Sequence, residues 1–347
     1  MKKLTLPMLM TIALLVSGAI IFSSCTKEGP EGPAGANGVD GADGNATCGQ
    51  CHDLSAQLVA IIGQYNNSFH GTGPDHERNG TSCAPCHTHQ GFLEVLATGL
   101  DETAADIENP ARINCRTCHK IHETYTAADY GLRATGPVTL HIHDDVVDFG
   151  KGNSCVGCHQ GRAFSDGQEP DPLALTDSVT FTSSRFGVHH GPQGNILGGV
   201  GGFEIPGSMS YTTPAAHTSI TDGCVQCHMA TAFGYAAGGH TWWMEYEYHG
   251  ATEPNMAGCD VTGCHPGEED FDINGVMTQI HELHDSLGNV LINLGIMTPT
   301  FSAVPGTWTN LHAGGVWTHQ MIREDRSFGV HNPKYTKALL INVLESL

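Results

Sequence analysis

Cysteine and histidine recur together along this 347-residue chain, which contains 13 cysteines and 22 histidines. Five segments have the pattern Cys-x-x-Cys-His, and a sixth has four residues between its cysteines instead of two. Two thiols at the shorter spacing can form thioether bonds to the two vinyl groups of one porphyrin, and the adjacent histidine then lies beneath the iron as its proximal ligand. The pattern predicts about six haem c groups. Their expected binding residues are Cys48, Cys51 and His52; Cys83, Cys86 and His87; Cys115, Cys118 and His119; Cys155, Cys158 and His159; Cys224, Cys227 and His228; and Cys259, Cys264 and His265.

Other chemistry also uses paired cysteines. Cys-x-x-Cys occurs in zinc sites, redox pairs and disulfides, but none of these requires a histidine after every pair. The fivefold repetition with histidine therefore favours haem, and an oxidised Cys-x-x-Cys pair is the alternative in an exported chain. For the sixth segment, the alternative is a structural disulfide between Cys259 and Cys264.

The region from Cys48 to the C-terminus resembles the multihaem c-type cytochromes of bacterial envelopes. The resemblance is carried by the six segments and by three flanking phrases, at residues 185–195, 238–242 and 329–340. It implies that these phrases carry distal haem ligands, that the wider sixth motif binds haem as in some low-potential members, and that the haems are mostly bis-histidine and of low potential. A methionine as distal ligand would raise the potential of its haem.

The histidines left after the six proximal ones outnumber the distal positions, so sequence context must select among them. His331 precedes Asn332 and Pro333, which can cap and begin a helix. His240 stands between glycine and a pair of tryptophans, and His70 follows a predicted helix over residues 53–64. The expected distal ligands are His70, His143, His189, His217, His240 and His331.

Two of these choices leave an alternative open. His189 and His190 are adjacent, and the sequence does not separate them. His143 is preferred to His122 because His141 and His143 lie two residues apart on a strand-like run, which would place both imidazoles on one face. The histidines expected not to bind haem are His76, His89, His249, His281, His284, His312 and His319.

The N-terminus has the features of an export signal. Lys2 and Lys3 precede an apolar run from Leu4 to Phe22, which ends at small residues before Cys25. We interpret residues 1–25 as a signal peptide whose lipobox places a lipid on Cys25, the alternative being an ordinary secretory signal. The protein is then expected to be exported and anchored at the bacterial outer membrane, on its periplasmic or surface face.

A glycine-rich segment follows the signal. Residues 29–46 form Gly-X-Y triplets in strict register, which a collagen triple helix would explain. So short a run with few prolines is more typical of a disordered linker, and we expect residues 26–46 to be an acidic tether. Cys25 and the six motifs together account for all 13 cysteines.

The negative net charge of the chain limits which macromolecules are expected to bind it. The formal net charge of −21 repels phosphate backbones, which excludes nucleic acid as an expected partner. An acidic surface attracts proteins with basic patches, and this attraction weakens as salt rises. The expected partners are redox proteins with basic patches, other multihaem cytochromes and, through the lipid, the membrane.

The composition predicts a small protein core. Hydrophobic residues make up 39% of the chain and aromatic residues 7%, whereas 44 residues are glycine. The expected fold is mainly α with extensive coil and little β structure, packed around haem, with motifs over 48–265 and a C-terminal helical segment over 266–347. Helices are predicted at 276–294 and 333–347, and the insertion from 161 to 216 is predicted to hold loops and a short hairpin.

The leading functional hypothesis is electron transfer along a chain of haems, with no catalytic residues. The alternative is a multihaem reductase that acts on a nitrogen or sulfur oxyanion at one haem without a distal ligand. A third hypothesis is a structural role in a filament.

Overall fold

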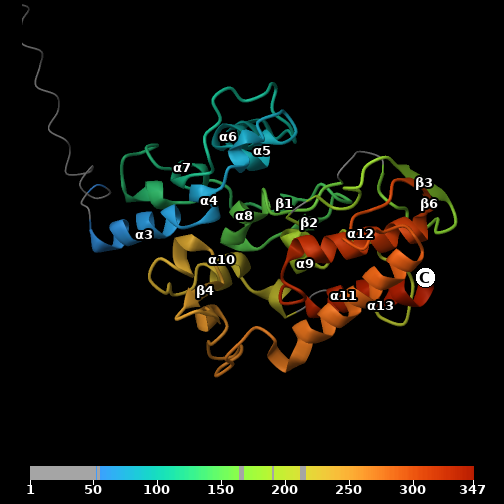
Figure 1. Cartoon of the computed structure of the whole chain (residues 1–347). Coiled ribbons are helices and arrows are strands. Elements are labelled where there is room, and N and C mark those ends of the chain that lie inside the picture. The colour runs from blue at the N-terminus through green and yellow to red at the C-terminus, as the bar shows by residue number, and fades with distance from the viewer. Residues whose placement is uncertain (1–51, 53–54, 164–167, 190, 212–215) are drawn as a thin grey trace, which may run out of the picture. The chain divides into compact units, whose positions relative to one another are not determined.

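Short helices joined by long loops make up most of the computed structural model (Figure 1). It describes residues 52, 55–163, 168–189, 191–211 and 216–347. The predicted signal 1–25, the tether 26–46, Cys48, Cys51 and His190 lie outside the described residues. The expected mainly helical fold with extensive coil and little β structure is confirmed.

The longest helices lie near the C-terminus. The α-helices are α3 (Ala56–Asn66), α4 (Phe69–Thr72), α5 (Ala84–His87), α6 (His89–Thr98), α7 (Cys115–Cys118), α8 (Asn153–Val156), α9 (Gln193–Gly198), α10 (Gly223–His228), α11 (Val276–Asn293), α12 (Asn310–Asp325) and α13 (Pro333–Ser346). The 3₁₀ turns are η1 (Asp75–Glu77), η2 (Ala127–Tyr130), η3 (Gly150–Gly152), η4 (His217–Ser219), η5 (Gly239–Thr241), η6 (Met256–Gly258) and η7 (Ile273–Gly275). No helix in the described ranges is both long and apolar enough to cross a bilayer.

Side-chain caps explain where two of the helices begin. The Ser55 hydroxyl accepts a hydrogen bond from the Leu58 backbone N–H at the start of α3, and Asn332 accepts one from the Tyr335 N–H at the start of α13. Pro333 occupies the first turn of α13, where no backbone donor is needed. The structure therefore starts α13 at the position predicted from Asn332 and Pro333.

The strands form three two-stranded antiparallel sheets in the described part of the chain. They pair β1 (Val138–Thr139) with β2 (Val146–Val147), β3 (Ser178–Phe181) with β6 (Gly306–Thr309), and β4 (Glu245–Tyr248) with β5 (Ala251–Pro254). The short hairpin predicted within 161–216 is wrong for the described residues of this range, because the one strand that they form, β3, pairs with β6 from the C-terminal segment. This pairing joins the insertion to the C-terminal segment, at the strand that precedes helix α12.

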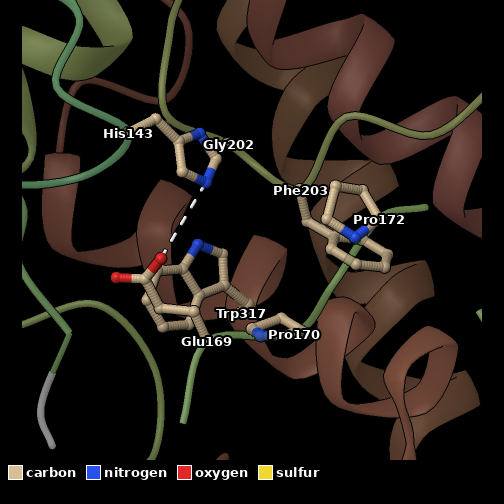
Figure 2. A pocket seen from close by; sticks show the side chains of 7 residues that line it. All are labelled: His143, Glu169, Pro170, Pro172, Gly202, Phe203 and Trp317. Atoms are coloured by element: carbon tan, nitrogen blue, oxygen red, sulfur yellow. Dashed lines mark ion pairs between the residues drawn. The ribbon is translucent and has the colours of Figure 1, made fainter. Parts of the chain in front are cut away.

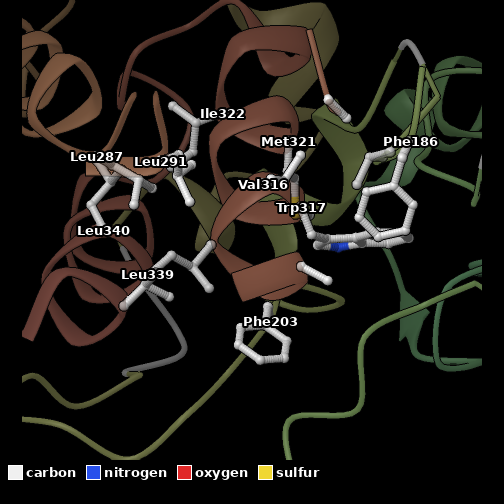
Figure 3. Close-up of a cluster of buried hydrophobic side chains, with 14 of the residues drawn as sticks. Phe186, Phe203, Leu287, Leu291, Val316, Trp317, Met321, Ile322, Leu339 and Leu340 are labelled. Atoms are coloured by element: carbon white, nitrogen blue, oxygen red, sulfur yellow. The ribbon is translucent and has the colours of Figure 1, made fainter. Parts of the chain in front are cut away.

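The C-terminal helices enclose a conventional hydrophobic core. Helices α11, α12 and α13 pack against one another, and Figure 1 shows them side by side in orange and red. Leu287, Leu291, Val316 and Leu339 are fully buried between them (Figure 3). Phe203 adds a buried ring from the insertion. The insertion and the C-terminal segment thus share one core.

The N-terminal motif region is packed differently. Within its described residues from 52 to 139, and apart from Pro85, burial of hydrophobic side chains is limited to Ala84 and Phe92. Large apolar side chains such as Val59 and Phe69 are instead exposed. The small core expected from composition therefore describes the N-terminal region and fails for the C-terminal one.

The first prediction concerns the C-terminal core. Leu287→Ala should lower the free energy of unfolding by about 2–5 kcal/mol, because Leu287 has no exposed surface and its truncation leaves a cavity. Leu294→Ala is the matched control, since Leu294 is 38% exposed, and it should cost less than about 1 kcal/mol. Urea unfolding of the haem-loaded protein, followed by far-ultraviolet circular dichroism, measures both. Equal losses in the two variants would contradict this description of the core.

Candidate haem-binding sites

The described motifs share a turn that is closed by one backbone hydrogen bond. The histidine N–H donates to the carbonyl oxygen of the first cysteine, and this turn brings the two thiols and the imidazole to one side of the backbone. The N···O distances are 3.2 Å from His87 to Cys83, 2.9 Å from His119 to Cys115, and 2.8 Å from His159 to Cys155. Helices α5 and α7 supply this turn in the second and third motifs.

The sixth motif closes in the same way despite its two extra residues. The His265 N–H donates to the Cys259 carbonyl oxygen at 3.1 Å, while a smaller turn from Cys264 N–H to Val261 O, at 3.0 Å, takes up the added length. The two extra residues of the sixth motif therefore form a bulge in the loop, and the hydrogen bond between the first cysteine and the histidine is kept. Cys259 and Cys264 are both free thiols in the structure.

Each motif histidine faces a second histidine from a distant part of the chain. We call these pairs sites 1 to 6, numbered by their motifs. The distances between ring centroids are 6.1 Å for His52 and His122, 6.4 Å for His87 and His189, 6.3 Å for His119 and His240, 6.1 Å for His70 and His159, 6.3 Å for His228 and His331, and 6.0 Å for His217 and His265. No histidine occurs in two of these pairs.

This separation matches two imidazoles that share one metal ion. Two metal–nitrogen bonds of about 2 Å, with about 1 Å from each nitrogen to its ring centre, add up to about 6 Å. Histidines in direct contact lie much closer, as His284 and His319 show with stacked rings at 3.8 Å. The separation within each pair therefore leaves room for one metal ion bound to both rings, and these imidazoles, together with the motif cysteines, are the residue types that haem c requires.

Hydrogen bonds orient several of these imidazoles. The Nδ1 atoms of His119, His217 and His228 lie 2.6, 2.5 and 3.1 Å from the carbonyl oxygens of Tyr130, Val330 and Trp242. A carbonyl can only accept, so each Nδ1 carries the proton and donates it. The Nε2 lone pair of the same ring is then available to a metal.

Burial keeps other imidazoles of the pairs neutral. Desolvation lowers the pKa of His70 to about 4 and that of His228 to about 4, and it also lowers the pKa of His159 and of His240. Histidine binds metal as the neutral imidazole, so these four imidazoles are in the form that binds a metal at neutral pH.

Comparisons with family models, with curated proteins and with solved structures find no match to this chain. The assignment of the six sites therefore depends on the motifs and on the distances between their histidines. Within the described residues, no cluster of three or more histidine, cysteine, aspartate or glutamate side chains could hold a bare metal ion.

The structure places five of the expected distal ligands, His70, His189, His217, His240 and His331, opposite motif histidines, and it places His143 elsewhere. The expected strand-like run does not form, because His143 occupies the turn between β1 and β2. Its Nε2 lies 3.9 Å from a Glu169 carboxylate oxygen, as Figure 2 shows. His122, the less favoured alternative, faces His52 instead and replaces His143 in the proposed set of ligands.

Sequence reasoning missed the residue that shapes the loop around His122. The buried Asp129 carboxylate accepts hydrogen bonds from the backbone N–H groups of His122, Thr124 and Tyr125, at 2.9, 2.8 and 3.0 Å. His122 and Tyr125 have φ angles of 69° and 57°, a region that side chains disfavour. Asp129 therefore holds a strained loop, and no motif in the sequence marks it.

Contacts between cysteines connect four of the sites. The Cys158 thiol of site 4 donates to the Pro85 carbonyl oxygen within the motif of site 2, at 3.9 Å. Cys155 of site 4 lies beside Cys224 of site 5, and their interaction raises the pKa of Cys155 and lowers that of Cys224. Burial, followed by the charge of Cys259 in site 6, raises the pKa of Cys227 in site 5 to about 11. Site 4 therefore adjoins sites 2 and 5, and site 5 adjoins site 6.

The remaining connections run through aromatic rings and the chain itself. Trp242 lies 4.9 Å from the ring of His70 in site 4 and 5.6 Å from that of His240 in site 3. His119 of site 3 and His122 of site 1 are three residues apart. The sites therefore form the order 1, 3, 4, 5, 6, with site 2 beside site 4.

Proposed function

We propose that this chain binds six haem c groups and transfers electrons among them. The observation that carries the proposal is that six motif histidines each face a different histidine at 6.0 to 6.4 Å. When bound, each haem would supply an iron that is oxidised and reduced by one electron, and the protein would set its potential through ligands, burial and hydrogen bonds.

The residues divide this work between attachment and coordination. The cysteines of each motif would attach the haem covalently, and the two histidines of each pair would hold its iron. With two histidines available at every site, no iron would be left with a free position for a substrate. This favours an electron carrier over a reductase of nitrogen or sulfur oxyanions. Histidine at both positions also favours lower potentials than a histidine and methionine pair.

The contacts between sites support a continuous electron path. Cys158 of site 4 contacts the motif of site 2 at Pro85, Cys155 of site 4 lies beside Cys224 of site 5, and Trp242 lies between proposed ligands of sites 3 and 4. Site 4 is then the junction of the path, with site 2 as a branch. Sites 1 and 6 are its two ends.

The same proposal includes anchoring and docking. Lipid attachment at Cys25 would hold the protein at the outer membrane, and the net charge of −21 would attract redox partners with basic patches or other multihaem cytochromes. Labelling with a radioactive fatty acid in the producing cell tests the anchor, because Cys25→Ser should abolish the label. Electron exchange with a basic partner should slow as salt rises.

Haem counting with spectroscopy tests the central proposal. The purified protein should contain six haems per chain, all low-spin and six-coordinate by electron paramagnetic resonance and all reducible by dithionite. Cyanide and nitrite should leave the spectrum unchanged, because no axial position is open. A high-spin haem that turns over nitrite or hydroxylamine would support the reductase instead, and fewer than five haems would overturn the proposal.

A further inference from the structure

In site 5, a carboxylate accepts a hydrogen bond from the distal imidazole. The Nδ1 of His331 lies 2.7 Å from Oδ1 of Asp325, the last residue of α12, and the Asp325 side chain is 2% exposed. The Nδ1 partners of His119, His217 and His228 are backbone carbonyls, and that of His159 is the Gln193 side-chain oxygen at 3.3 Å. Among these five histidines, His331 is therefore the one whose Nδ1 has a negatively charged carboxylate as its partner.

The structure fixes this carboxylate in place. Its other oxygen, Oδ2, accepts a hydrogen bond from the Ser327 hydroxyl at 2.5 Å. That hydroxyl in turn accepts one from the His331 backbone N–H, at 3.2 Å. Within the described residues, the ion pair of Asp325 is with His331, and no lysine or arginine neutralises it. The result is a closed ring of hydrogen bonds that joins Asp325, Ser327 and His331.

We propose that Asp325 is a positioning residue that lowers the reduction potential of site 5 through His331. The inference rests on the proposed function, since it requires haem between His228 and His331. A carboxylate that accepts a hydrogen bond from the Nδ1–H group makes the imidazole a stronger electron donor to the iron. The negative charge of the carboxylate also stabilises the oxidised iron more than the reduced iron. Both effects disfavour the added electron at this site.

The position of site 5 gives this effect a consequence for the electron path. Site 5 adjoins site 4 through Cys224 and Cys155, and site 6 through Cys227 and Cys259. An electron that moves between sites 4 and 6 must therefore pass a site whose reduction Asp325 disfavours. Asp325 would then limit the rate of electron flow toward site 6.

Asp325→Asn tests the inference in the haem-loaded protein. Asparagine keeps the shape of the aspartate side chain, and its amide oxygen can still accept a hydrogen bond from the Nδ1–H group, but it carries no charge. At fixed potential, the ratio of reduced to oxidised haem should rise about tenfold at one of the six sites, because a hydrogen bond to a charged acceptor is stronger than one to a neutral acceptor. That ratio corresponds to about 59 mV for one electron. A redox titration followed by visible absorption measures the shift.

A spectroscopic signature and a control separate tuning from a structural effect. The g values of one low-spin signal should move in Asp325→Asn, and Asp325→Glu should restore the potential at least in part. Asp272→Asn makes the same chemical change at a carboxylate that accepts hydrogen bonds from Thr278, and all six potentials should stay unchanged. Six unchanged potentials in an Asp325→Asn protein that still holds the haems of the wild type would overturn the inference alone, whereas a wild-type protein with fewer than five haems would overturn the proposed function.

Discussion

Replacing His122 by alanine is expected to convert one of six low-spin haems to a high-spin haem. His122 faces His52 with ring centroids 6.1 Å apart, so its removal leaves the iron of site 1 with one axial protein ligand. A five-coordinate haem, or one with weakly bound water, has a high-spin electron paramagnetic resonance signal. About one sixth of the low-spin intensity should be lost, and the modified protein should gain a site that binds cyanide.

His143→Ala is the matched comparison, because it removes the histidine that sequence context preferred. His143 contacts Glu169 and belongs to no pair with a motif histidine among the described residues. Its replacement should leave the spin state of all six haems unchanged. A high-spin signal in His143→Ala, with none in His122→Ala, would reverse the assignment of site 1.

Replacing both cysteines of the sixth motif should reduce the haem content from six to five. In Cys259→Ser/Cys264→Ser, the two thioether bonds of site 6 cannot form, so haem at that site would be lost on denaturation. Pyridine haemochrome absorption and the mass of the intact denatured protein measure the covalent haem. The backbone turn from His265 to Cys259 is the reason to expect haem here, since it copies the turn of the shorter motifs.

Cys83→Ser/Cys86→Ser provides the positive comparison at a motif of ordinary spacing, and it should lose the same amount of haem. A disulfide between Cys259 and Cys264 predicts a different result. The double serine variant would then keep every haem of the parent, and the parent mass would be two hydrogens lower than that of the reduced polypeptide plus its haems. That outcome would reduce the number of proposed sites to five.

The motif residues could be predicted from sequence because their pattern is local. One helical turn or a turn like it contains both cysteines and the histidine, so spacing along the chain is enough to predict that these three side chains come together. Boundaries with a local cause, such as Asn332 and Pro333 at the start of α13, could be predicted for the same reason. Long helices such as α11 could be predicted from their period.

Features that depend on distant contacts were harder to predict. The choice between His122 and His143 depends on a loop that Asp129 holds in an unusual conformation, and a strand-like pattern pointed to the other histidine. The pairing of β3 with β6 joins residues more than a hundred positions apart, which the alternation of residues in β3 cannot indicate. The pairing of Asp325 with His331 likewise depends on the turn that follows α12.

The uneven distribution of the hydrophobic core has a consequence for biogenesis. The C-terminal helices can bury Leu287, Leu291 and Leu339 without any cofactor, whereas the N-terminal motif region buries few apolar side chains of its own. In a chain that is exported and receives haem as proposed, the C-terminal part could therefore fold first while the N-terminal motif region stays open to haem attachment. A chain that misses its haems would keep that open region as a target for envelope proteases, so quality control would act on the N-terminal motifs first.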